Sequence, residues 1–186
     1  MSARAVFLDR DGVVNEAVTR NGKPYPPASV RETRIVARAE ESLKRLKDLG
    51  FLLIVVTNQP DVRRGDLRQE EVEEIHRFLA GRLPLDGFFV CYHDDSDACS
   101  CRKPLPGLLF QAVAQHGIAI ETSYLIGDRW RDIDAGAAAG CRTVLIDHGY
   151  DERAPASAPD VRVSSLEQAV DWIIGQEHQR SRPASH

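Results

Sequence analysis

Five short apolar runs alternate with stretches of helical periodicity, and this alternation constrains the fold of the 186-residue chain more than any other feature. A buried strand, a helix and a second buried strand form a right-handed crossover unit. We therefore predict an α/β fold, a Rossmann-like three-layer sandwich in which helices flank a mainly parallel sheet. The expected strands are residues 6–8, 51–56, 88–90, 123–126 and 142–146, with an added edge strand at 161–163.

Helices are expected between these strands, where apolar residues recur at helical spacing. They are residues 37–49, 66–79, 106–117, 135–140 and 166–174. Asp66 and Gln69 resemble a capping pair at the start of the second helix. His76 lies on the same helix, and we expect it to be structural.

The length of the chain suits one domain with its own core. No second domain boundary is visible, so we predict a single domain over residues 1–175 and a frayed tail over 176–186. Residues 15–33 are rich in Pro and Gly and show no clear period, which predicts a long loop. Loops of this length inside a compact domain are often functional.

Two carboxylates follow the first apolar run. Asp9 and Asp11 stand where the strand gives way to a turn, and Gly12 lets the backbone bend there. Adjacent carboxylates repel each other, and Mg²⁺ is a cation that binds such oxygens together with a substrate phosphate. With the metal bound, Asp9 could attack phosphorus while Asp11 transfers protons. Asp-x-Asp is also common in solvated turns, so the pair alone does not establish an active site.

Polar residues also follow the second and fourth strands. Thr57 and Asn58 could hold the oxygens of a transferring phosphoryl group, although Thr-Asn after a strand is also a common turn or helix cap. Asp128 could complete a metal site, and Asp132 could orient a ligand or Lys103 from outside the metal's own shell. Because strand ends meet at one edge of a parallel sheet, we expect these groups to converge.

Three of the four cysteines lie within eleven residues, together with a histidine. Cys91, His93, Cys99 and Cys101 supply four ligands, enough to close a tetrahedral Zn²⁺ site that pins the loop. The alternatives are free thiols beside a surface histidine, or a disulfide, which a reducing compartment disfavours. The remaining Cys141 is expected to be a small core residue.

Two cations follow the cysteine cluster directly. Lys103 is suited to hold phosphate as a point charge and Arg102 through its guanidinium fork. An Arg-Lys pair taken by itself is usually a solvated surface feature. Its place beside a loop that a metal could pin favours the phosphate interpretation.

Taken together, these strand ends resemble the four motifs of the haloacid dehalogenase (HAD) superfamily of phosphohydrolases. The motifs are carried here by residues 9–12, 57–58, Lys103 and 127–132. The chain is most similar to the small, capless enzymes of subfamily IIIA, which are related to D-glycero-D-manno-heptose 1,7-bisphosphate phosphatase and histidinol-phosphate phosphatase. Residues 7–12, 56–59 and 91–104 reproduce the sequence patterns of that group.

The resemblance implies a Mg²⁺-dependent phosphomonoesterase that works through an aspartyl-phosphate. It implies Asp9 as nucleophile and Asp11 as general acid/base, with the phosphoryl group stabilised by Thr57, Arg102 and Lys103. Mg²⁺ would bind Asp9, the backbone carbonyl of Asp11, and Asp128, and the cysteine cluster would be a structural zinc site. Substrate contacts are expected from Arg10, Asn15, Asn58, Gln59 and Arg129.

The implied substrate is a small phosphorylated metabolite, and removal of the C7 phosphate from the heptose bisphosphate is the first expectation. Histidinol phosphate or another small sugar phosphate is the alternative. Pro60 and Asp61 depart from the family pattern by removing a backbone N–H and adding a negative charge. Without a large cap domain, substrate selection falls to residues 15–33, residues 60–65 and the zinc loop.

The net charge of −4 and the pI near 5.9 argue against a general nucleic-acid or membrane-surface binder. A nucleic-acid end phosphatase would also need a basic groove, which the sequence does not show. No apolar segment suits a membrane span or a signal peptide, so we expect a cytoplasmic monomer. A non-catalytic, zinc-bearing interaction module is the alternative of another class, but a decayed enzyme should have lost one of Asp9, Asp11, Lys103 or Asp128, and all are present.

Overall fold

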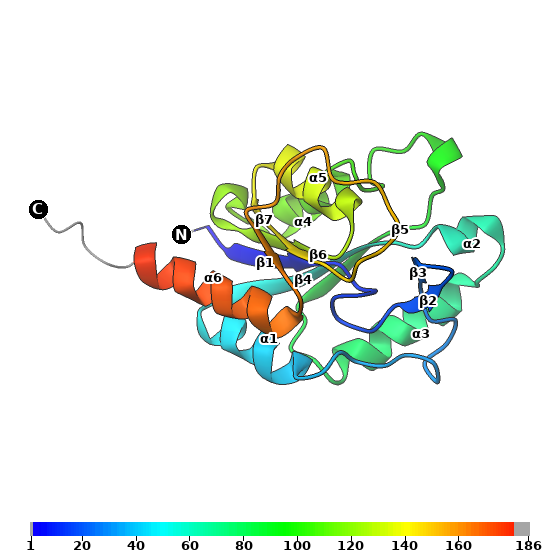
Figure 1. Ribbon diagram of the computed structural model, residues 1–186, viewed down its shortest axis with the longest axis horizontal. Coiled ribbons are helices and arrows are strands. Elements are labelled where there is room, and N and C mark those ends of the chain that lie inside the picture. Colours follow the sequence, from blue (N-terminus) through cyan, green and yellow to red (C-terminus); the bar gives the residue numbers. More distant parts are fainter. Residues whose placement is uncertain (1, 181–186) are drawn as a thin grey trace, which may run out of the picture.

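The computed structural model of the protein describes residues 2–180 and is built on a six-stranded sheet (Figure 1). All neighbouring strands in this sheet run parallel. Their order is β5 (Gly87–Cys91), β4 (Phe51–Asn58), β1 (Arg4–Leu8), β6 (Tyr124–Gly127), β7 (Arg142–Ile146) and β8 (Val161–Val163). The predicted α/β fold and its edge strand are confirmed.

Alternating side chains of the central strand enter two separate cores. Val6 and Leu8 belong to one core, and Ala5 and Phe7 to the other, as the two-residue period of a strand requires. The first core is covered by α1 (Ala39–Asp48), α3 (Gln69–Ala80) and α6 (Leu166–Arg180). The second is covered by α4 (Gly107–His116) and α5 (Trp130–Ala139), so that helices lie on both faces of the sheet (Figure 1).

The helices form where apolar spacing predicts them, but several boundaries differ. The α3 helix begins after Arg68, whose backbone N–H donates to the Glu71 carboxylate at 2.9 Å. The predicted capping pair of Asp66 and Gln69 is therefore wrong by two residues. The α5 helix is longer than the predicted 135–140 because its first turn begins directly after the acidic strand end.

The final helix also extends beyond its predicted end. Residues 176–180 are helical rather than frayed, and residues 181–186 lie outside the described part of the chain. Glu177 ties this last stretch to the sheet, since it accepts a 2.7 Å hydrogen bond from the Tyr124 hydroxyl and pairs with Arg4. These contacts of a buried carboxylate stabilise the additional helical turn.

The predicted loop at residues 15–33 contains a β-hairpin instead. Its strands are β2 (Val18–Arg20) and β3 (Lys23–Tyr25), joined by a turn in which Asn21 and Gly22 both have positive φ. Asn-Gly is the sequence that such two-residue hairpin turns favour. In Figure 1 the hairpin lies at the end of the sheet where β4 stops.

The segment after β4 forms a short helix, α2 (Pro60–Arg64). Pro60 occupies the first turn, where a missing N–H costs nothing because that group has no helical partner anyway. Asp61 pairs with Arg64 at 3.2 Å, which offsets its negative charge. Pro60 and Asp61, which depart from the family pattern, are thus both accommodated in the short helix α2.

Candidate active site

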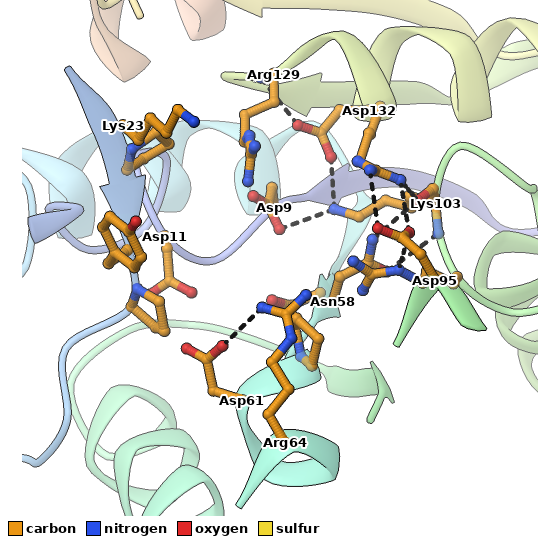
Figure 2. A pocket seen from close by; sticks show the side chains of 17 residues that line it. Asp9, Asp11, Lys23, Asn58, Asp61, Arg64, Asp95, Lys103, Arg129 and Asp132 are labelled. Atoms are coloured by element: carbon orange, nitrogen blue, oxygen red, sulfur yellow. Dashed lines mark hydrogen bonds and ion pairs between the residues drawn. The ribbon is translucent and has the colours of Figure 1, made fainter. Parts of the chain in front are cut away.

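The side chain of Lys103 crosses the carboxyl edge of the sheet and joins two carboxylates. Its ammonium lies 2.8 Å from Asp9 Oδ1 and 2.5 Å from Asp132 Oδ1 (Figure 2). It donates a third hydrogen bond to the carbonyl of Val56 at 2.8 Å. All three donors of the ammonium are therefore used. Lys103 is 2% exposed, so these charges interact with little screening from water.

A third carboxylate, that of Asp128, lies beside this pair. Carboxylate oxygens of Asp9, Asp128 and Asp132 all lie within 4.8 Å of one another. Both oxygens of Asp128 are buried and make no hydrogen bond of ordinary geometry with residues 2–180, although the nearby Tyr150 hydroxyl lowers the pKa of this carboxyl. A side-chain Cβ at Gly12 would lie 1.9 Å from one of these oxygens, so only glycine permits the close approach. Unpaired buried oxygens beside a second carboxylate fit a hard divalent cation such as Mg²⁺.

The protonation of these carboxylates reflects their burial. Burial raises the pKa of Asp9 to about 6, with the charges of Asp132 and Asp11 adding to the shift and Lys103 opposing it. Burial and the charges of Asp9 and Asp132 also raise the pKa of Asp128 well above its ordinary value. A bound cation would reverse these shifts because it favours the ionised form.

Asp11 does not join this cluster but is held by its own set of donors. Arg10 donates to both carboxylate oxygens at 2.9–3.2 Å. Asn15 donates to one oxygen at 2.9 Å and Gln59 to the other at 2.8 Å. Burial opposes ionisation, but the charge of Arg10 and these hydrogen bonds together lower the pKa of Asp11. Asp11 is therefore an ionised carboxylate in this arrangement.

Three residues predicted to contact substrate instead donate hydrogen bonds to Asp11; we call Arg10, Asn15 and Gln59 the Asp11 cradle. Arg10 and Asn15 are fully buried and Gln59 is 1% exposed, and their donors point at Asp11. The expected substrate contact does not fit this placement. Sequence proximity to the Asp-x-Asp turn indicated the right neighbourhood, but it carried no information about side-chain direction.

The residues at the second strand end position Lys103. Asn58 donates to the Lys103 carbonyl at 3.0 Å and accepts from the Lys103 N–H at 3.1 Å. Thr57 is buried and accepts a 2.9 Å hydrogen bond from Gln59. Thus Asn58 fixes the backbone from which Lys103 extends, and Thr57 is one of the residues that line the pocket.

A pocket opens above these residues and is lined by charges of both signs (Figure 2). Its cations are Lys23, Arg64, Arg102, Lys103, Arg129 and Arg131, and its carboxylates are Asp9, Asp11, Asp61, Asp95 and Asp132. Most of the cations are already paired, as Arg129 is with Glu152. Lys23 on the hairpin makes no ion pair with the described residues. It faces the pocket from the side opposite Lys103 (Figure 2).

The cysteine cluster has the dimensions of a tetrahedral metal site. The sulfur of Cys101 lies 3.1 Å from that of Cys91 and 3.5 Å from that of Cys99, and Nδ1 of His93 lies 3.3 Å from Cys101. Zinc–sulfur bonds of about 2.3 Å give tetrahedral sulfur–sulfur separations of about 3.8 Å, whereas a disulfide needs about 2.05 Å. Burial raises the pKa of the Cys91 thiol, so a thiolate there requires a cation. The four residues therefore fit a zinc ion and exclude the disulfide alternative.

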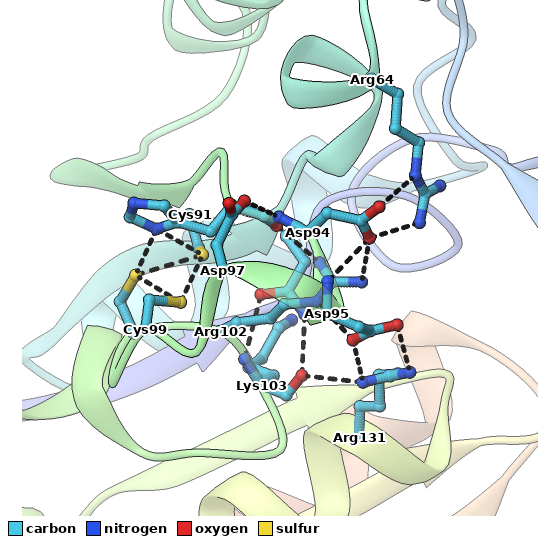
Figure 3. Close-up of polar contacts among 12 residues, drawn as sticks. Arg64, Cys91, Asp94, Asp95, Asp97, Cys99, Arg102, Lys103 and Arg131 are labelled. Atoms are coloured by element: carbon cyan, nitrogen blue, oxygen red, sulfur yellow. Dashed lines mark hydrogen bonds and ion pairs between the residues drawn. The ribbon is translucent and has the colours of Figure 1, made fainter.

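The same loop brings paired charges to the pocket (Figure 3). Arg102 donates to Asp95 at 2.8 Å and to the carbonyl of His93 at 3.2 Å, and Arg131 donates to the same Asp95 at 3.2 Å. Arg64 of α2 binds Asp94 at 2.6 Å. A cation in the cysteine cluster would thus fix the position of Arg102 through the loop backbone.

A family model for HAD-like hydrolases matches residues 100–169. The D-glycero-beta-D-manno-heptose-1,7-bisphosphate 7-phosphatase of Helicobacter pylori strain J99 is 32% identical over 176 residues, which cover 91% of this chain and 97% of the relative. The enzyme of the same name from Yersinia pestis is 34% identical, with 93% and 90% covered. The chain belongs to this family of HAD-like phosphatases.

A solved structure agrees with this assignment. The crystal structure of D,D-heptose 1,7-bisphosphate phosphatase from B. bronchiseptica, complexed with magnesium and phosphate, has a TM-score of 0.75 at 26% identity. The match covers 93% of this chain and 99% of that one. None of the helices within residues 2–180 is long and apolar enough to cross a membrane.

In this HAD-like phosphatase the structure brings together most of the residues predicted from strand ends. Asp9, Thr57, Asn58, Arg102, Lys103, Arg129 and Asp132 all line one pocket, with Asp128 directly behind it. Sequence analysis missed Lys23, Arg64 and Arg131 as pocket cations. The Asn-Gly turn signalled the hairpin that carries Lys23, whereas Arg131 gave no signal beyond its place in the acidic strand end.

Proposed function

We propose that the protein removes the C7 phosphate of D-glycero-D-manno-heptose 1,7-bisphosphate through an aspartyl-phosphate on Asp9. The observation that carries this proposal is the Lys103 ammonium bound between Asp9 and Asp132, with the buried carboxylate of Asp128 beside them. The relatives that bear this activity in their names support the choice of substrate. Histidinol phosphate and other small sugar phosphates are the alternatives.

Asp9 would act as the nucleophile from a fixed position. Its backbone N–H donates to the Ile126 carbonyl at 2.9 Å, and its carboxylate is held at one oxygen by Lys103. The second oxygen is thereby left to approach phosphorus in line with the leaving group. Lys103 would also balance the charge that the phosphate brings into the buried site.

Magnesium, held by Asp9, Asp128 and the Asp11 backbone carbonyl, would supply a Lewis acid that draws charge from the phosphate oxygens. Asp132 binds Lys103 at 2.5 Å, so we assign it the orientation of the lysine. Zinc at the cysteine cluster would have no open position for substrate and would only hold the loop.

Asp11 would exchange protons with the leaving oxygen and then with water. Its three donors keep it ionised, which is the form that accepts a proton from water. A bound phosphate adds negative charge nearby and thus favours proton uptake by Asp11 before the first step. The cradle would therefore fix the orientation of the Asp11 carboxylate, while the bound substrate would determine whether this carboxylate is protonated.

The unpaired Lys23 supports a substrate with a second anionic group. The phosphate being cleaved would lie against Lys103 on the pocket floor, and Lys23 faces it from the hairpin above. A bisphosphate could use both cations, whereas histidinol phosphate would bring its own cation toward Lys23. This difference favours the bisphosphate.

The test is phosphate release by the Mg²⁺- and Zn²⁺-loaded protein from heptose 1,7-bisphosphate, histidinol phosphate and a panel of sugar phosphates. Asp9→Asn should abolish release, while Asp48→Asn on the exposed end of α1 should not. Preferred turnover of the bisphosphate is expected. Turnover of another compound alone would contradict the substrate, and no turnover with both metals bound would favour the non-catalytic module.

A further inference from the structure

The α3 helix contributes a histidine to the back of the Asp11 cradle. Nε2 of His76 lies 3.1 Å from one terminal nitrogen of the Arg10 guanidinium. Arg10 is fully buried and His76 is 8% exposed. The imidazole is stacked on Phe88 of β5, with ring centroids 4.6 Å apart and planes 23° from parallel. Helix and sheet together therefore fix the direction of this ring.

The chemistry of the contact determines the protonation of His76. A guanidinium carries only donors, so Nε2 must accept the hydrogen bond and the ring proton must lie on Nδ1. The imidazole is therefore neutral. Burial and the neighbouring Arg10 charge lower the pKa of His76 to about 3, in agreement with this geometry.

The two edges of the Arg10 guanidinium have different partners. Nε and one terminal nitrogen face the Asp11 carboxylate at 2.9–3.2 Å, and the other terminal nitrogen faces His76. The Arg10 carbonyl also accepts hydrogen bonds from the backbone N–H groups of Val14 and Asn15 at 2.9 and 3.0 Å. Loss of the His76 acceptor would leave a buried donor unsatisfied on a charged group, and the guanidinium would turn to find another partner.

We propose that His76 is a positioning residue for proton transfer, because it orients Arg10 and through it the Asp11 carboxylate. The inference rests on the proposed role of Asp11 as general acid/base. His76 itself neither lines the pocket nor touches substrate. Its effect would appear in the step that needs a proton and not in substrate binding.

The test compares two leaving groups in His76→Leu and His76→Gln. The kcat/KM for heptose 1,7-bisphosphate depends on protonation of a sugar alkoxide, whereas p-nitrophenyl phosphate releases a stable phenolate that needs no proton. His76→Leu should lower kcat/KM by about tenfold for the bisphosphate and by less than about twofold for the aryl phosphate. His76→Gln should restore the bisphosphate rate, since its amide oxygen can accept from Arg10.

A matched control exists on the opposite face of the sheet. His116 of α4 packs edge-on against Phe89 of β5, with centroids 6.1 Å apart, and is remote from the pocket. His116→Leu should leave the ratio of the two kcat/KM values unchanged. If His76→Leu does not fold, His76→Met offers a flexible side chain without a nitrogen acceptor for the same comparison.

Two results would overturn the proposal. One is an unchanged ratio of the two kcat/KM values in His76→Leu, whether or not both values fall. The other is a His76→Gln variant that behaves like His76→Leu. Asp11→Asn separates this failure from failure of the proposed function. If Asp11→Asn lowers kcat/KM equally for both substrates, Asp11 is not the general acid, and the proposed roles of Asp11 and His76 both fall.

Discussion

The ammonium of Lys103 donates a 2.8 Å hydrogen bond to Oδ1 of Asp9, although 94 residues separate the two in sequence. This pair joins the loop after the cysteine cluster to the end of the central strand. Both residues are buried, so the positive charge is available to a phosphate only on the pocket side of Asp9. The pair thus orients the proposed nucleophile and marks the floor of the site.

Replacing Lys103 should affect both activity and stability. Lys103→Met removes a buried positive charge that would balance the charge of the phosphoryl group, so kcat should fall by about two to three orders of magnitude. It also leaves Asp9 and Asp132 buried without their cation, which should lower the free energy of unfolding by about 3–5 kcal/mol without Mg²⁺. Steady-state kinetics and urea unfolding measure these effects. Lys44→Met, on the exposed face of α1, should change neither, and wild-type kcat in Lys103→Met would refute the role.

Magnesium should stabilise the protein more at high pH than at low pH. Burial raises the pKa of Asp9 from 3.8 to about 6, and it raises the pKa of Asp128 in the same direction. Stability from these protonated groups is present below the unfolded pKa and is lost as the pH rises through the folded value. The metal-free Tm should therefore fall between about pH 4 and pH 7, and Mg²⁺ should restore it mainly above pH 6.

The control for this prediction is Asp128→Asn, which lacks one of the two carboxylates whose pKa is raised by burial. In thermal melts with and without Mg²⁺, this variant should show a smaller difference between about pH 5 and pH 7.5 than the wild type. An equal metal-induced rise in Tm at both pH values would show that Asp9 and Asp128 do not bind the ion.

Removal of zinc should alter the pocket but leave the position of Asp9, the proposed nucleophile, unchanged. Cys101→Ser opens the tetrahedron of Cys91, His93, Cys99 and Cys101, so the bound zinc should fall from about one per chain to a fraction of that. Because Arg102 follows the cluster directly, kcat/KM should fall by about tenfold and the Tm should fall as well. Metal analysis and kinetics test this. The Cys141→Ser variant changes a cysteine outside the cluster, so this protein should keep its bound zinc.

Lys23 should matter only for substrates with a second phosphate. Lys23→Met should raise KM for heptose 1,7-bisphosphate by about tenfold and leave KM for p-nitrophenyl phosphate unchanged, because only the bisphosphate reaches the hairpin. Arg20→Met is the matched control, since Arg20 lies over Tyr25 on the same hairpin but does not line the pocket. A similar rise in KM for both substrates would argue against a second anion site.

The sequence allowed much of the candidate site to be predicted because several of its groups follow apolar runs. Asp9, Thr57 and Asp128 stand at ends of buried strands, and parallel strands carry such ends to one edge whatever their order in the sheet. The cysteine cluster was predictable for a different reason, since its four residues lie within eleven positions of the sequence.

The direction of individual side chains could not be predicted in this way. Arg10, Asn15 and Gln59 lie next to the motifs, yet each turns toward Asp11 because that buried carboxylate needs donors. The role of His76 depends on the packing of α3 against β5, which brings it beside Arg10 across 66 residues of sequence. Such contacts follow from tertiary packing and leave no local pattern.

The most direct test of the central claim is rapid acid quenching of the enzyme during turnover of heptose 1,7-bisphosphate labelled at the C7 phosphate. The account predicts labelled protein that hydroxylamine releases, located at Asp9 and absent from Asp9→Asn. The label should accumulate in Asp11→Asn when labelled p-nitrophenyl phosphate is the substrate, because its leaving group needs no proton while water activation is slow. A wild-type protein that releases phosphate without label, together with no accumulation in Asp11→Asn, would contradict Asp9 as the nucleophile, and so would label that persists in Asp9→Asn.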